Sequence, residues 1–79
     1  MRISYDPTAD AAYIYIVESV GAAGVDFTYG CDPAAVGGMI HLDFDSDGRL
    51  VGLEILGASS KLPVAILREA ERERESGGQ

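Results

Sequence analysis

A run of acidic residues in the second half of the chain has the spacing of a calcium-binding loop. From Asp43 to Glu54 the sequence reads DFDSDGRLVGLE, with aspartates at loop positions 1, 3 and 5, glycine at 6 and glutamate at 12. This is the pattern of an EF-hand loop, in which carboxylate oxygens surround a Ca²⁺ ion. Asp43, Asp45 and Asp47 are therefore candidate cation ligands.

The residues on either side of this loop favour a β-hairpin instead. An EF-hand needs a helix before and after its loop, whereas Met39–Phe44 and Leu50–Leu56 alternate as strands do. Asp45–Gly48 has the composition of a turn between them. In such a hairpin Glu54 lies opposite Met39, too far from the turn to reach an ion held there. We therefore predict no metal site, and keep a cation-binding acidic turn as an alternative function.

A loop of four residues also predicts how the two strands pair. It places Phe44 opposite Arg49, Leu42 opposite Val51 and Ile40 opposite Leu53. This register gathers the apolar residues of both strands on one face of the sheet. A slip by one residue would turn Glu54 toward the core, so the hydrophobic pattern itself selects the register.

The opposite face of this hairpin carries His41, Asp43 and Glu54. A histidine beside carboxylates can act as a general base or a metal ligand. The same alternation is typical of a solvated sheet face, whose polar side chains point outward. The single cysteine, Cys31, could be a nucleophile, but no base is assigned to it. We assign no catalytic residue and no cofactor, and keep a small enzyme that uses His41 with Asp43 or Glu54 as a further alternative.

The whole pattern predicts a single α+β domain over residues 1–75, followed by a disordered tail at 76–79. Alternation and turn composition indicate an antiparallel sheet of four to five strands, at about 2–6, 12–17, 25–29, 39–44 and 50–56. Pro63 and the apolar spacing after it predict one C-terminal helix at 62–75, packed on one face. The two glycines at 37 and 38 argue against a helix in that segment.

The predicted core combines apolar residues from the sheet and the helix. Its members are Ile3, Tyr5, Ile14, Ile16, Phe27, Ile40, Leu42, Phe44, Val51, Leu53, Ile55, Ile66 and Leu67. One helix covers only part of one face, and a chain of 79 residues has little core to stabilise it. The strand at 12–17 is apolar on both sides. We therefore expect Tyr13, Tyr15 and Val17 to form an interface with a second copy, giving a homodimer, or with a small protein partner.

Charge and composition narrow the classes of partner. Six basic residues against thirteen acidic ones give a net charge of -7, and the basic residues do not cluster. A nucleic-acid-binding surface would be basic, so we expect no nucleic acid. No apolar run approaches membrane-spanning length and no signal peptide is evident, so we expect no membrane. A lone cysteine is typical of a reducing compartment, which predicts a cytoplasmic location.

Two blocks of sequence resemble the DUF2283 family. The first is Tyr5-Asp6-Pro7 with Asp10-Ala11 and Tyr13-Ile14, and the second runs from Ile40 to Ser59 through the acidic turn. The resemblance covers residues 3 to 60 and implies a small bacterial domain without an established biochemical function. It implies a strand–turn–strand at the acidic turn, and an antitoxin-like role as a neutraliser of a basic partner. It assigns no catalytic residues. The Gly/Ala-rich stretch 18–38 departs from the family pattern.

Overall fold

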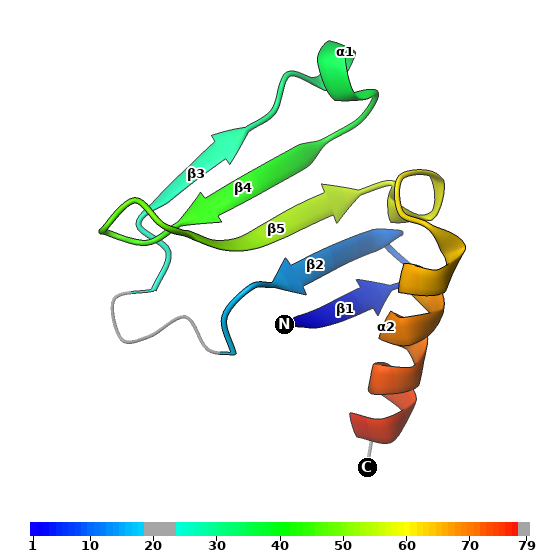
Figure 1. The fold of residues 1–79 in the computed structure, drawn as a ribbon. Helices are drawn as coiled ribbons and strands as arrows, with labels where there is room; N and C mark the ends of the chain where they lie inside the picture. Colours follow the sequence, from blue (N-terminus) through cyan, green and yellow to red (C-terminus); the bar gives the residue numbers. More distant parts are fainter. Residues whose placement is uncertain (19–23, 78–79) are drawn as a thin grey trace.

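The computed structural model describes residues 1–18 and 24–77, the last four by their backbone alone. Its centre is a five-stranded antiparallel sheet with the helix α2 (Val64–Gly77) at one end (Figure 1). The strands are β1 (Arg2–Asp6), β2 (Ala11–Tyr15), β3 (Phe27–Gly30), β4 (Ile40–Phe44) and β5 (Leu50–Leu56). They lie in the order β1-β2-β5-β4-β3, so the β1–β2 hairpin and the β4–β5 hairpin meet where β2 pairs with β5. The α+β fold is confirmed, with all five strands present.

Three helical segments connect or end the strands. The helix α1 (Pro33–Val36) is a single turn that the sequence analysis did not predict. Asp32 caps it by accepting a hydrogen bond from the backbone N–H of Ala34, and Gly37 ends it at φ 71°. The 3-10 turn η1 (Ala58–Ser60) follows β5, and the predicted C-terminal helix is present as α2, which begins at Val64, two residues after the predicted start. The helix reaches Gly77, and residues 78–79 of the predicted tail lie outside the described part of the chain.

The β4–β5 hairpin has the predicted faces but not the predicted partners. Phe44 pairs with Leu50 across a five-residue loop, and a bulge then shifts the ladder so that Leu42 pairs with Leu53 and Ile40 with Ile55. The loop and the bulge each add one residue, and the total shift of two leaves the side chains beyond the bulge on their expected faces. As a consequence, Glu54 lies opposite the candidate site residue His41 and not, as predicted, opposite Met39.

The core lies where β1, β2 and β5 meet η1 and α2. Ala12, Ile55 and Ala58 are buried at its centre, packed by half-buried residues that include Leu53, Leu62 and Leu67. Two predicted core residues are exposed, Phe27 at 55% and Ile66 at 39%, and most of the others are half-buried. Phe27 is exposed because α2 packs mainly against β1 and does not reach β3.

Asp10 joins the first hairpin to the segment after β5. Its carboxylate accepts hydrogen bonds from the hydroxyl of Tyr5 (2.7 Å) and from the backbone N–H (2.9 Å) and hydroxyl (2.8 Å) of Ser59. Its backbone carbonyl accepts from the N–H of Ala58 at 3.0 Å. The hydrogen bonds from Tyr5 and Ser59 hold the pKa of Asp10 below its ordinary value. Asp10 is the one non-glycine residue with positive φ, 50°, among the residues that the structure describes.

Candidate functional site

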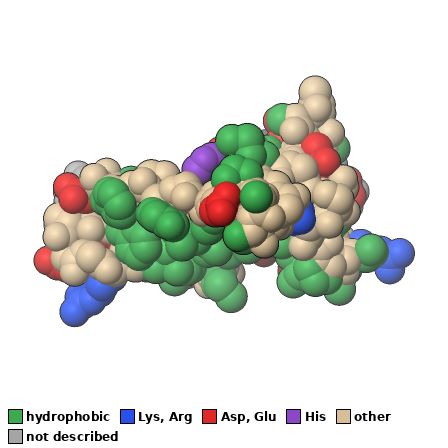
Figure 2. Space-filling view, turned by 90° about the horizontal axis from the view of Figure 1, so that it is seen from above, with side chains coloured by type: hydrophobic (Ala, Val, Ile, Leu, Met, Phe, Trp, Pro, Cys, Tyr) green, Lys and Arg blue, Asp and Glu red, His purple; other side chains and the backbone are tan. Residues whose placement is uncertain are grey.

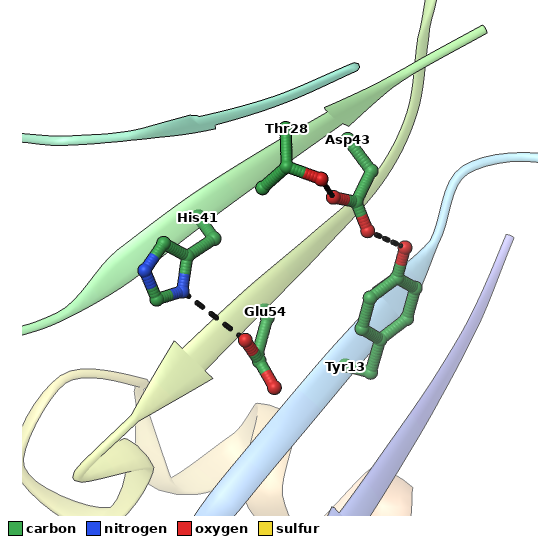
Figure 3. Close-up of polar contacts among 5 residues, drawn as sticks. All are labelled: Tyr13, Thr28, His41, Asp43 and Glu54. Atoms are coloured by element: carbon green, nitrogen blue, oxygen red, sulfur yellow. Dashed lines mark hydrogen bonds and ion pairs between the residues drawn. The ribbon is translucent and has the colours of Figure 1, made fainter. Parts of the chain in front are cut away.

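The two faces of the sheet differ in the side chains that they carry. Side chains alternate across a strand, so the strand pairing puts Tyr13, Thr28, His41, Asp43 and Glu54 on the side turned away from α2. Figure 3 shows these five side chains on one side of the sheet. We call this set the polar face. The candidate residues His41, Asp43 and Glu54 do share it, as the sequence predicted, together with Tyr13 of the first hairpin.

Asp43 is the centre of the polar face. Its Oδ2 accepts a hydrogen bond from the hydroxyl of Tyr13 at 2.5 Å, and its Oδ1 accepts one from the hydroxyl of Thr28 at 2.6 Å (Figure 3). Burial, and then the hydrogen bond and charge of Asp43, raise the pKa of Tyr13 above its ordinary value. Asp43 therefore links β2 to β3 across the two strands between them. Both of its oxygens are used in this link.

The Tyr13 ring reaches Asp43 by lying over Gly52 of β5. A Cβ atom built on Gly52 would come within 2.6 Å of two ring carbons of Tyr13, closer than any real contact. Gly52 is thus required for the side-chain bridge and not for a turn. A glycine inside a strand pattern is a known sign of such close approach, and it was the signal in the sequence that could have located this contact.

His41 pairs with Glu54 and not with Asp43. Its Nδ1 lies 3.1 Å from Oε1 of Glu54, with side-chain exposures of 28% and 47%. The ring also lies close to Gly30, where an added Cβ would be 3.3 Å from its Cδ2. A cavity of about 400 Å³ beside β1 includes Glu54 and Tyr13 in its lining, but His41 does not line it. The dyad of the enzyme hypothesis is thus formed by His41 and Glu54, on a partly open surface.

The acidic turn uses its carboxylates to hold its own backbone. Oδ1 of Asp45 accepts hydrogen bonds from the backbone N–H of Asp47 (2.9 Å) and of Arg49 (3.0 Å). Gly48 closes the turn at φ 79°. The strands on both sides confirm the hairpin and not a helix–loop–helix hand. Among the side chains of residues 1–18 and 24–73, no three histidine, cysteine or acidic groups converge on a position that could hold a metal ion.

The three residues expected at an interface are half-buried, and two of them have partners within the chain. Tyr13 contacts Asp43 as described, and its ring centroid is 4.7 Å from that of Tyr15. The guanidinium carbon of Arg2 lies 3.9 Å from the centre of the Tyr15 ring, a cation–π distance. Val17 follows the end of β2. The side chains of the two tyrosines therefore already have contacts within the chain, and only part of their surface is open to another molecule.

The larger exposed apolar area is on the other face, over β3 and β4. It consists of Phe27 and Tyr29, each more than half exposed, beside the half-buried Leu42 and Phe44. The rings of Phe27 and Phe44 are 5.9 Å apart. We call these four residues the open apolar surface. Figure 2 shows hydrophobic side chains gathered over a broad area on the side opposite to the histidine. Sequence reasoning placed Phe27 in the core and so missed this surface.

Comparisons with known proteins identify a family without assigning an activity. No helix in the described part of the chain has the length and apolar character needed to cross a membrane. No curated protein and no solved structure shows significant similarity to the chain. One family model matches residues 2–59, from β1 through the Ser59 that Asp10 binds. The chain belongs to that family, described as a protein of unknown function (DUF2283).

Proposed function

We propose that this domain is a protein-interaction module and that its main contact area is the open apolar surface. The single observation that carries the proposal is the exposure of two neighbouring aromatic residues, Phe27 at 55% and Tyr29 at 52%, on the part of the helix-bearing face of the sheet that α2 does not cover. Clustered exposed aromatic residues favour association, because burying each ring removes a large apolar area from water.

The polar face supports this choice by contrast. Its titratable side chains already contact one another, as in the pairs Tyr13–Asp43 and His41–Glu54. The rings of Phe27 and Tyr29, in contrast, remain more than half exposed. The surface of Tyr13, Tyr15 and Val17 is the second candidate for an interface, supported by its three half-buried apolar side chains.

The chemistry of the partner can be argued from charge. A net charge of -7 favours a basic protein, as an antitoxin-like neutraliser would require, and disfavours phosphate backbones. An apolar contact between two acidic copies would strengthen when salt screens their repulsion, whereas contact with a basic partner would weaken. We place this function in the cytoplasm, on the ground of the single cysteine.

The test is a quantitative purification from the cells that naturally produce the protein. Wild type is compared with the double variant Phe27→Ser, Tyr29→Ser, and with the control Tyr15→Ser on the other face. We expect a stoichiometric companion, a second copy or another protein, that the double variant loses at unchanged circular dichroism. Loss with Tyr15→Ser alone would move the interface to the tyrosine surface. No stoichiometric companion with wild type would refute the proposal.

A further inference from the structure

The two edges of the sheet are protected to different degrees. β1 lies at one edge and is packed by α2, while β3 lies at the other edge and all four of its residues are exposed. Sheet edges that must stay unpaired are usually very short or carry proline, lysine or a bulge. β3 is short, with four residues, but its sequence, Phe27-Thr28-Tyr29-Gly30, carries no proline, lysine or bulge. The edge is open to another strand.

The direction of the backbone groups along this edge follows from the hydrogen bonds to β4. The N–H of Cys31 donates to the carbonyl of Ile40 at 2.9 Å, so the backbone of Cys31 points into the sheet. Because these groups alternate in an antiparallel ladder, Tyr29 also points toward β4. Thr28 and Gly30 therefore direct their N–H and C=O groups to the outer side.

We propose that a second copy of this chain pairs with β3 in antiparallel orientation, with Thr28 of each copy opposite the other. This inference rests on the proposed function and names a second copy of the chain, and not a basic protein, as the partner at β3. The two outward-pointing Thr28 residues would exchange both backbone hydrogen bonds across a two-fold axis, as isologous dimers do. The two five-stranded sheets then join into one.

Side-chain pairing favours this register over its neighbour. With Thr28 at the axis, Phe27 lies opposite Tyr29 of the second copy in a non-hydrogen-bonded pair, where side chains approach most closely. The open apolar surfaces become continuous, and Asp26 lies beside Gly30 of the second copy but outside the ladder, because its backbone N–H donates to the carbonyl of Phe44 at 2.8 Å. A register centred on Tyr29 would set Asp26 opposite Asp32, and directly opposed like charges destabilise a sheet. The edge is self-complementary only in the first arrangement, which is why a second copy fits it.

Two substitutions of Thr28 separate the backbone from the side chain. Thr28→Pro removes the outward N–H but none of the inward hydrogen bonds to β4, whereas Thr28→Val keeps that N–H and removes only the hydroxyl that binds Asp43. Sedimentation equilibrium of the full chain measures the dimer constant for each. We expect wild type to dimerise, more tightly at higher salt. Thr28→Val should stay within about threefold of wild type and Thr28→Pro should weaken the dimer at least tenfold, a change of ~1.4 kcal/mol.

A cross-link tests the register independently. Thr28→Cys in a Cys31→Ser background should form an intermolecular disulfide under mild oxidation, since directly opposed residues of a hydrogen-bonded pair lie about 5.5 Å apart. Ser46→Cys in the same background, exposed in the hairpin turn, is the control and should form no intermolecular disulfide. A wild-type chain that is monomeric at all concentrations overturns this inference, while a companion lost with Phe27→Ser, Tyr29→Ser would still uphold the proposed function. A dimer that tolerates Thr28→Pro, or cross-links equally at both sites, overturns the β3 pairing.

Discussion

The sheet has two halves that resemble each other in strand geometry and differ in what covers them. In the covered half, β1, β2 and β5 pack against η1 and α2, and Asp10 binds the segment after β5. In the open half, β3 and β4 carry apolar side chains of the same kind, but no helix in the described part of the chain packs over them, and Phe27 is exposed. The same alternating pattern thus makes a core in one half and a surface in the other. The position of one helix decides which.

The largest test of this contrast compares truncations in the two halves. Ile55→Ala removes a side chain that is 3% exposed in the covered half and should cost about 2–5 kcal/mol of unfolding free energy. Phe27→Ala in the open half should cost less than about 1 kcal/mol of unfolding free energy in dilute solution. The Phe27 ring is already more than half exposed in the folded chain, so unfolding exposes little additional apolar area of this side chain. Urea denaturation followed by circular dichroism measures both. Equal losses at micromolar protein would show that the open half is covered after all.

Substitution of Asp10 should have the next largest effect on stability, because this residue joins the first hairpin to the segment after β5 in the covered half. Asp10→Ala removes all three side-chain hydrogen bonds. It also places alanine, which has no polar side chain to stabilise a left-handed backbone, at φ 50°. We therefore expect the Tm to fall by about 5 to 10 °C.

Asp10→Gly separates these two causes, since it loses the same bonds but tolerates positive φ, and should retain a higher Tm than the alanine variant. The pKa of Asp10 is lowered, so its contribution is present above the unfolded pKa near ~4 and is lost as pH falls through the folded value. Wild type and Asp10→Ala should therefore converge in acid. Parallel curves down to the acid limit would contradict the role of the carboxylate.

The bridge between the halves is the next target. Gly52→Ala would push the Tyr13 ring away from its place over β5 and break the hydrogen bond to Asp43, at a cost of about 1–3 kcal/mol. Gly48→Ala is the matched control, because nothing lies within 4 Å of its added Cβ and only the positive φ of 79° is strained. The Cβ clash should vanish in the double variant Gly52→Ala, Tyr13→Ala, so non-additive stabilities are the expected sign of contact.

A smaller effect should be visible in alkaline solution. The folded state raises the pKa of Tyr13, whereas the unfolded chain releases this proton near pH ~10. The stabilisation is therefore complete below that pH and is lost as pH rises toward the folded value. Denaturant midpoints measured from pH 8 to alkaline values should fall less steeply in Tyr13→Phe. Tyr5, whose pKa is raised mainly by Asp10, titrates in the same direction and should leave a residual slope.

The smallest expected change concerns the acidic turn. The Asp45 oxygen that would bind a cation already accepts two backbone hydrogen bonds, and Asp43 is turned to Tyr13 and Thr28. At 1 mM Ca²⁺ we expect less than about 0.4 kcal/mol of stabilisation, the amount given by a Kd of about 1 mM. A larger shift that disappears in Asp47→Asn would revive the cation-binding alternative.

Much of the fold was predictable from the sequence because alternation determines which face a residue occupies. The strands at 2–6 and 50–56 were predicted with their final bounds, and even the unforeseen bulge near Phe44 preserved the predicted faces. The exact partners were wrong, since periodicity carries no information on loop length or bulges. The exposure of Phe27 depended on where α2 packs, which no local pattern encodes.

The candidate site was less accessible. The polar face was predicted because His41, Asp43 and Glu54 follow the period of a strand. The contacts that organise it join residues far apart in sequence, such as Tyr13 and Asp43 or Asp10 and Ser59. Gly52 and the turn residue Asp10 were visible signals, but each can be explained locally. Only their partners in space show what they do.

The central position of β5 also implies an order of assembly. Closing β4 onto β5 needs only the five-residue loop Asp45–Arg49, whereas pairing Tyr15 of β2 with Gly52 encloses the 36 residues from 16 to 51. The difference in loop-closure entropy is about 1.7 kcal/mol in favour of the shorter loop. We expect the β4–β5 hairpin to act as the template on which the first hairpin docks. Pulse-labelled hydrogen exchange would then protect the amides of β4 before those of β2, and Asp10 would bind Ser59 last.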